Sequence, residues 1–217
     1  MNKVISFNGV DGSGKTTQIN LLMSKYSSLI EKIGNSQTVS NPKIGDFNWW
    51  FRTSTPEEFA EAIYQSIEKR NELIEKSKKP IVLLDKGLNN FDARVIATLM
   101  TKNVDENTSK EIIEYFKRKY NIINLEDLSI FFEIAQNIQE RKQITEVRKF
   151  SELRCNDQQL YSIYQDYQNE IIQKQIDNNE YYLFDASGTI EEVNQRLCEI
   201  IFPDPNLINV NVRKRNL

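Results

Sequence analysis

The sequence feature that most constrains the fold is a glycine-rich segment near the N-terminus. Residues 9–16 read Gly-Val-Asp-Gly-Ser-Gly-Lys-Thr, which fits the phosphate-binding pattern G-x-x-x-x-G-K-[ST]. Glycines let successive backbone N–H groups curl round anionic oxygens, and a following helix N-terminus adds positive potential. Lys15 can then reach the outer phosphates, and the Thr16 hydroxyl can ligate Mg²⁺. The residues expected to bind a nucleoside triphosphate here are Gly9, Gly12, Ser13, Gly14, Lys15, Thr16 and Thr17.

The residues on either side of this loop supply the structural context that the motif requires. Residues 3–7 form a short, mostly apolar run, which is typical of a buried parallel strand. After the loop, apolar residues recur at helical spacing, namely Ile19, Leu22, Met23 and Tyr26. The sequence therefore predicts a strand, a glycine loop and a helix in succession, which is the arrangement in which this motif binds phosphates.

The composition excludes several kinds of chemistry. Among 217 residues there is no histidine, which excludes histidine-ligated metals and histidine-dependent triads. The formal net charge of −3 argues against a nucleic-acid partner. Cys155 and Cys198 lack metal-binding or redox spacing, so we expect reduced thiols. The chain has no run of 18 apolar residues and begins directly with a strand, so we expect no membrane span, no signal peptide and a cytoplasmic location.

Strand-like and helical runs alternate along the rest of the chain, a pattern typical of a parallel sheet covered by helices. After a turn at residues 34–36, further strands are expected at 38–40, 81–85, 127–134 and 181–184. Helices are expected at about 56–76, 89–102, 109–120, 157–177 and 190–201. The length suits one α/β domain over residues 1–202, followed by an irregular tail at 203–217.

The strand at residues 81–85 is the clearest after the first, with four apolar residues followed by Asp85. Ligands of such folds bind at the carboxyl ends of the parallel strands. We therefore expect Asp85 to act on Mg²⁺ or on its water ligands. The alternative is a strand-end carboxylate that caps the next turn.

Two other segments carry less specific signals. The aromatic run at residues 47–52 favours core or interface packing, with a wall of an acceptor pocket as the alternative. Residues 137–154 are polar and include several cations, among them Arg141, Arg148 and Arg154. Such a run usually forms a solvated helix face, but in a fold that transfers phosphate it can equally be a lid over the γ-phosphate.

Taken together, these motifs resemble those of the thymidylate kinases and their relatives among the nucleoside-monophosphate kinases, over roughly residues 1–201. The glycine loop matches closely and includes the acid at Asp11, and Asp85-Lys86 stands where the family has Asp-Arg. Segments 125–128, 148–152 and 185–193 fit later landmarks of the family.

The resemblance implies a P-loop NTPase fold: a five-stranded parallel sheet flanked by helices, with a helical lid at about 137–154. It also implies ATP and Mg²⁺ as cofactors and a homodimer. Lys15 and Lys86 would be catalytic, as would Arg148 by stabilising the transferring phosphoryl group. Asp11 would hold a sugar hydroxyl of the acceptor, and Phe59 would stack on its base. The loop expected to touch adenine consists of Ala186, Ser187 and Gly188.

The acceptor-side motifs depart from those of the family. The arginine that grips the acceptor phosphate is replaced by Ser40, and the arginine that reads the base edge by Ile63. The family's Asp-Arg-Tyr/His is Asp85-Lys86-Gly87 here, and its later tyrosine falls on Arg94. Serine cannot replace a bidentate guanidinium, and lysine offers a point charge rather than a fork. Lys86 and Arg94 are therefore the expected ligands of a polar or anionic acceptor.

Two functions remain open at this point. The first is ATP-dependent phosphoryl transfer to a small acceptor, a nucleotide or a nucleoside-like molecule, with thymidylate as one candidate. The second is an ATP-binding regulatory or partner-binding module that has lost transfer, which the altered acceptor residues and the aromatic run motivate. ADP release that depends on an acceptor would separate the two.

Overall fold

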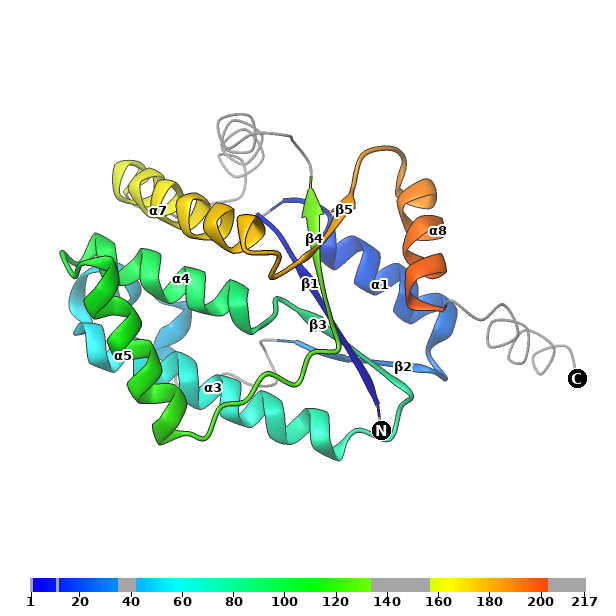
Figure 1. Cartoon of the computed structure of the whole chain (residues 1–217), viewed down its shortest axis with the longest axis horizontal. Helices are drawn as coiled ribbons and strands as arrows, with labels where there is room; N and C mark the ends of the chain where they lie inside the picture. The colour runs from blue at the N-terminus through cyan, green and yellow to red at the C-terminus, as the bar shows by residue number, and fades with distance from the viewer. Residues whose placement is uncertain (1, 11, 35–41, 134–156, 203–217) are drawn as a thin grey trace, which may run out of the picture.

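A computed structural model describes residues 2–10, 12–34, 42–133 and 157–202. Its centre is one five-stranded parallel sheet in the order β2-β3-β1-β4-β5 (Figure 1), which confirms the fold class expected from the sequence. The strands are β1 Lys3–Asn8, β2 Ile30–Ile33, β3 Ile81–Asp85, β4 Leu128–Glu133 and β5 Tyr182–Asp185.

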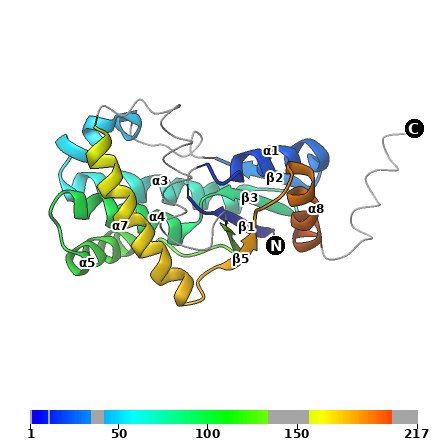
Figure 2. The same ribbon diagram turned by 90° about the horizontal axis from the view of Figure 1, so that it is seen from above.

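The helices divide between the two faces of this sheet (Figures 1 and 2). One face is covered by α1 (Lys15–Tyr26) and α8 (Ile190–Ile201), and the other by α3 (Pro56–Lys76), α4 (Leu88–Thr101), α5 (Glu106–Lys119) and α7 (Gln158–Asp177). A 3₁₀ turn at Pro42–Gly45 (η1) and a π-helix at Trp49–Thr53 (η2) precede α3. None of the helices in the described part of the chain is long and apolar enough to cross a membrane.

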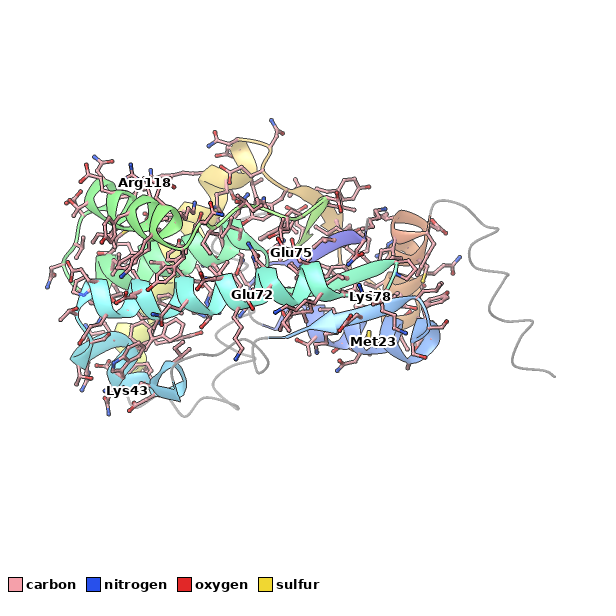
Figure 3. The ribbon with its side chains drawn as sticks, turned by 90° about the horizontal axis from the view of Figure 1, so that it is seen from below. Met23, Lys43, Glu72, Glu75, Lys78 and Arg118 are labelled. Carbon is pink, nitrogen blue, oxygen red and sulfur yellow. The ribbon has the colours of Figure 1, made fainter. Side chains whose placement is uncertain are left out.

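The alternation of side chains along the strands creates two cores. On β4, Phe132 packs toward α1 and α8, whereas Phe131 packs toward α3, α4 and α7. A sheet that is buried on both faces needs nearly continuous apolar strands, which explains the runs at β1, β3 and β4. In contrast, the outer face of α3 is polar and carries Glu72 and Glu75 (Figure 3).

The expected start of α3 is confirmed in detail. Thr55 is the N-cap, and its hydroxyl accepts a hydrogen bond from the Glu58 backbone N–H. The Glu58 carboxylate in turn accepts from the Thr55 backbone N–H, which completes a capping box with Pro56 at the first helical position. These local contacts satisfy backbone donors that the helix itself leaves open.

The expected second strand at residues 38–40 was misplaced. The second strand of the sheet is β2 at Ile30–Ile33, whereas residues 35–41 lie outside the described part of the chain. Ile30 and Ile33 follow Leu22 and Tyr26 at spacings of four and three, so they continue the apolar pattern of α1. The periodicity therefore hid a strand that begins four residues after the helix ends. The expected lid at 137–154 and tail at 203–217 also lie outside the described residues.

Candidate phosphate-binding and acceptor site

The glycine loop connects the buried strand β1 to helix α1, as the motif requires. Gly9 has a φ of 132°, and a Cβ at this position would lie 3.0 Å from the Phe132 carbonyl oxygen. Gly14 has a φ of 89° and is the N-cap of α1, with no side chain capping the helix. Because the N-cap is a glycine, it supplies no capping side chain, and the helix N-terminus presents a positive end to an anion.

Lys15 lies over this loop rather than in solvent. Its side chain is buried, and its ammonium donates to the carbonyl oxygens of Gly9 and Val10 at 3.0 and 2.8 Å and to Ser13 Oγ at 3.0 Å. The oxygens of a bound phosphate also accept hydrogen bonds, and their negative charge makes them stronger partners for the ammonium. A cation in such a low-dielectric position acts strongly on a neighbouring anion. The loop thus holds Lys15 where its charge can meet bound phosphates.

Thr16 and Asp85 come together from two different elements. The Thr16 hydroxyl donates to Asp85 Oδ2 at 2.9 Å. The contact forms because Asp85 ends β3, which pairs with β1 in the register Phe7↔Asp85, so both strands end beside the start of α1. A hydroxyl and a carboxylate oxygen are ligands that Mg²⁺ accepts alongside phosphate oxygens and water. The two residues fit a magnesium site, and their role as ligands stays a prediction.

The loop after β5 leads into α8, and hydrogen bonds join α8 to the same helix α1. Gln18 of α1 donates to the Ile190 carbonyl oxygen at 3.0 Å and accepts from Asn194 Nδ2 at 3.1 Å. The guanidinium of Arg196 donates to the carbonyl oxygens of Asp185 and Ser187, at 2.9 and 2.6 Å. Arg196 therefore braces the loop that contains Ala186, Ser187 and Gly188, a supporting role that the sequence alone did not reveal.

The acceptor-side residues gather around α4, η2 and α7. Arg94 of α4 has its guanidinium carbon 5.3 Å from the ring centroid of Trp50, and its Nε donates to Tyr164 Oη at 3.3 Å. The ring of Phe59 packs edge-on against Trp50, with centroids 4.7 Å apart. Lys86 lies in the turn that leads into the same helix α4. The structure thus brings Arg94, Trp50 and Phe59 together. Arg94 belongs to α4, the helix that follows the turn after the metal-binding candidate Asp85.

The aromatic run at 47–52 is part of the core, as its first interpretation expected. Trp49 and Phe51 are buried, and Phe51 packs on Tyr164 with ring centroids 5.2 Å apart. Phe59 is 0% exposed, so an acceptor base stacking on its ring requires the neighbouring Trp50 to move. Trp50 itself is only partly buried. The stacking role of Phe59 stays a prediction, as do the roles of Asp11 and Arg148, which lie outside the described residues.

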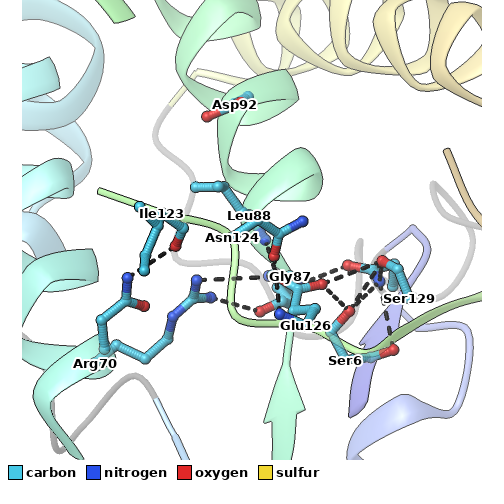
Figure 4. A network of polar contacts seen from close by, with 12 residues as sticks. Ser6, Arg70, Gly87, Leu88, Asp92, Ile123, Asn124, Glu126 and Ser129 are labelled. Carbon is cyan, nitrogen blue, oxygen red and sulfur yellow. Dashed lines mark hydrogen bonds and ion pairs between the residues drawn. The ribbon is translucent and has the colours of Figure 1, made fainter. Parts of the chain in front are cut away.

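Beneath the turn at residues 86–88 lies a buried polar network that the sequence analysis did not identify (Figure 4). Glu126 accepts hydrogen bonds from the hydroxyls of Ser6 and Ser129, and one of its carboxylate oxygens lies 3.9 Å from an Arg70 guanidinium nitrogen. Burial lowers the pKa of Arg70, and the Glu126 charge opposes this shift. One signal was available: Arg70 interrupts the apolar stripe of α3 that otherwise includes Ile63, Ile67 and Ile74.

Gly87 belongs to this network because a larger residue would displace it. A Cβ on Gly87 would lie 2.2 Å from Glu126 Oε2 and 2.5 Å from Ser6 Oγ. We expect Gly87→Ala to lower the free energy of unfolding by about 1–3 kcal/mol, the usual cost of overpacking. Denaturant unfolding measures this, with Gly45→Ala as the control, since no heavy atom lies within 4 Å of a Cβ there. Equal stability of the two variants would show that the network yields to the added methyl group.

Comparisons with known proteins find similarity in fold but no match in sequence. No protein-family model matches the chain, and no curated protein does so by sequence. In contrast, a solved structure of deoxyadenosine kinase from M. mycoides with bound dATP has a TM-score of 0.69 at 14% identity, covering 91% of this chain and 98% of that one. The same enzyme with dCMP and a flexible dCDP bound gives 0.67 at 14%, covering 93% of this chain and 100% of that one.

A thymidylate kinase is similar as well. The enzyme from Candida albicans has a TM-score of 0.61 at 18% identity and covers 93% of this chain and 92% of that chain. At identities this low the similarity establishes the fold and leaves the substrate open. The chain therefore has the P-loop fold that nucleoside and nucleotide kinases share, as its resemblance to the thymidylate kinases predicted.

Proposed function

We propose that this protein is a kinase that transfers the γ-phosphoryl group of ATP to a nucleotide or a nucleoside-like acceptor. The observation that carries the proposal is the hydrogen bond of 2.9 Å from the Thr16 hydroxyl to Asp85 Oδ2, which lies beside Lys15 in the glycine loop. Phosphoryl transfer depends on positioning and on positive charge more than on a proton relay. A chain without histidine is suited to such chemistry.

The donor half of the site would hold ATP and magnesium. In this proposal, the backbone N–H groups of residues 9–17 surround the phosphates, while Lys15 neutralises their outer oxygens as the bond to the γ-phosphoryl group loosens. Thr16 and Asp85 would hold Mg²⁺, which supplies further positive charge to the β- and γ-oxygens when it is bound. Ala186, Ser187 and Gly188, braced by Arg196, would contact the adenine.

The acceptor half would lie beside the N-terminal half of α4. Lys86 before this helix and Arg94 within it would supply positive charge, and the partly buried Trp50, which Arg94 contacts, would supply apolar surface for a base. Asp11 would hold a sugar hydroxyl, and Arg148 would stabilise the transferring phosphoryl group when a lid closes. Lys86 directly follows Asp85 in the chain, so the acceptor cation and the metal ligand share one strand end. This proximity supports a direct transfer between the two halves.

ADP formation from ATP–Mg²⁺ across a panel of nucleosides and nucleoside monophosphates tests the proposal. We expect slow release of ADP without an acceptor and a strong increase in the rate of ADP release with at least one member of the panel. A second candidate function, an ATP-binding regulatory module, is favoured by one observation: the ring of Phe59 is completely covered in this structure. ATP binding without stimulation by any acceptor would favour that second function. The implied homodimer and cytoplasmic location stay predictions, the former open to sedimentation analysis.

The metal role of Asp85 leads to a specific prediction. In Asp85→Asn the amide can still meet the Thr16 hydroxyl, but one negative charge at the metal site is lost. We expect the Mg²⁺ concentration for half-maximal activity to rise by about tenfold or more, with a smaller change in the KM for ATP. Titration of activity with Mg²⁺ measures this, and Asp177→Asn, on the exposed end of α7, is the control. An unchanged Mg²⁺ requirement would remove Asp85 from the metal site.

A further inference from the structure

The turn that joins β3 to α4 has a backbone conformation that its sequence does not favour. Lys86 has a φ of 85°, in the left-handed region. The other non-glycine residues with positive φ in the described part of the chain are all asparagines, at positions 103, 121 and 179. Asparagine tolerates this region, whereas lysine is strained there and persists only where its surroundings impose the conformation. Such strain is concentrated at functional sites.

Buried groups hold the main chain of this turn at each residue. The Lys86 N–H donates to the Phe7 carbonyl oxygen at 3.0 Å, and the Lys86 carbonyl oxygen accepts from Arg70 Nη1 at 3.2 Å. The Gly87 N–H donates to Asn8 Oδ1 at 2.7 Å, and the Leu88 N–H donates to Glu126 Oε1 at 2.5 Å. The turn is therefore clamped from α3, from β1 and from the segment before β4 (Figure 4).

Arg70 and Glu126 are better placed to hydrogen-bond the main chain of the turn than to form a close ion pair with each other. The side chains of Arg70 and Glu126 are 6% and 2% exposed, yet their nearest charged atoms are 3.9 Å apart. Arg70 directs one nitrogen to the Lys86 carbonyl oxygen, and its Nε has no hydrogen-bond partner among the residues that the structure describes. Burying two charges at this separation is costly. Their hydrogen bonds to the main chain of the turn offset part of this cost.

Gly87 shows that the clamp and the turn belong together. The Glu126 carboxylate fills the space that a side chain at position 87 would occupy. The same carboxylate, which comes from another segment of the chain, accepts a hydrogen bond from the Leu88 N–H.

We propose that Arg70 and Glu126 are positioning residues, which hold Lys86 in its left-handed conformation and thereby direct its side chain toward the reacting phosphoryl group. This inference rests on the proposed kinase function, because it assigns the clamp to the acceptor cation of that site. Without the clamp, the backbone of Lys86 relaxes toward an ordinary conformation, and its side chain takes another direction. The loss then appears in kcat, while ATP binding in the glycine loop is preserved.

A double-mutant cycle tests the clamp. Arg70→Met retains most of the side-chain volume and removes the donor to Lys86. We expect it to lower kcat by about tenfold to a hundredfold, with a KM for ATP within about twofold of wild type. In a Lys86→Ala background, Arg70→Met should lower kcat no further, because it acts through the missing ammonium. The matched control is Arg118→Met, an exposed arginine of α5 (Figure 3).

The possible outcomes separate this proposal from the kinase assignment. Effects of Arg70→Met and Lys86→Ala that multiply would give Arg70 a merely structural role and overturn the clamp. Where Arg70→Met fails to fold, Glu126→Met carries the same cycle, since it removes the acceptor of the Leu88 N–H. Normal kcat in a folded clamp variant would refute the clamp alone. A wild-type protein without acceptor-dependent transfer would overturn both proposals.

Discussion

Replacing Lys15 by alanine should remove most phosphoryl transfer while the protein stays folded. The ammonium contacts Gly9, Val10 and Ser13, which belong to the loop rather than to either core. Its charge is needed as negative charge shifts on the β- and γ-oxygens, and loss of one preorganised donor of this kind costs about a hundredfold to a thousandfold in kcat. Steady-state ADP formation at saturating ATP and acceptor measures the effect.

The control for this variant is Lys76→Ala, because Lys76 is an exposed lysine that pairs with Glu72 on the outer face of α3. We expect the control to match wild type in turnover, and both variants to melt within about 5 °C of wild type. Near-wild-type turnover in Lys15→Ala would contradict a catalytic phosphate loop. A large loss of stability would instead show that the lysine supports the loop's structure.

The second large effect concerns the choice of acceptor. We expect kcat/KM for dTMP to be lower by about a hundredfold or more than for the best acceptor in a nucleotide and nucleoside panel. Ser40 and Ile63 stand where the thymidylate kinases have two arginines, and Ile63 is a buried residue of the core between α3 and α4. Each lost charge-assisted contact costs about 1.5–3 kcal/mol, and about 1.4 kcal/mol corresponds to a factor of ten.

A direct comparison of kcat/KM values across the panel measures this preference. Closure of the lid expected from the sequence would be the alternative route to thymidylate binding, with Arg141 or Arg154 in the vacant arginine positions. A clear preference for dTMP at ordinary nucleotide-kinase efficiency would show that such a replacement occurs. The expected preference for another acceptor would show that the acceptor pocket has a specificity other than that for thymidylate.

The strand, glycine loop and helix at the start of the chain could be predicted from sequence because their determinants are local. Residues 3–26 contain a buried strand, a loop of fixed glycine spacing and an amphipathic helix, and each leaves its own pattern. The position of Asp85 could be predicted because a carboxylate that ends an apolar run in a parallel strand lies at the carboxyl edge of the sheet. The contact between Thr16 and Asp85 then follows from the pairing of β1 with β3.

The remaining features depend on contacts between distant segments. Glu126 lies near Arg70 although 56 positions separate them in the sequence. Their proximity depends on the order of the strands and on the packing of α3. No local pattern indicates such a pair, although an arginine in an apolar helical stripe was a partial signal. The strand Ile30–Ile33 was missed for the opposite reason, because its spacing also fits the helix before it.

The most direct test of the kinase assignment follows the phosphoryl group itself. ATP labelled with ¹⁸O in the γ-phosphoryl group is incubated with Mg²⁺, the protein and each acceptor, and the products are identified by mass spectrometry. The account predicts that three labelled oxygens appear on one acceptor as a new phosphoryl group, in step with ADP. Label found only in inorganic phosphate for every acceptor, with ATP binding intact, would contradict the account and leave an ATP-binding module.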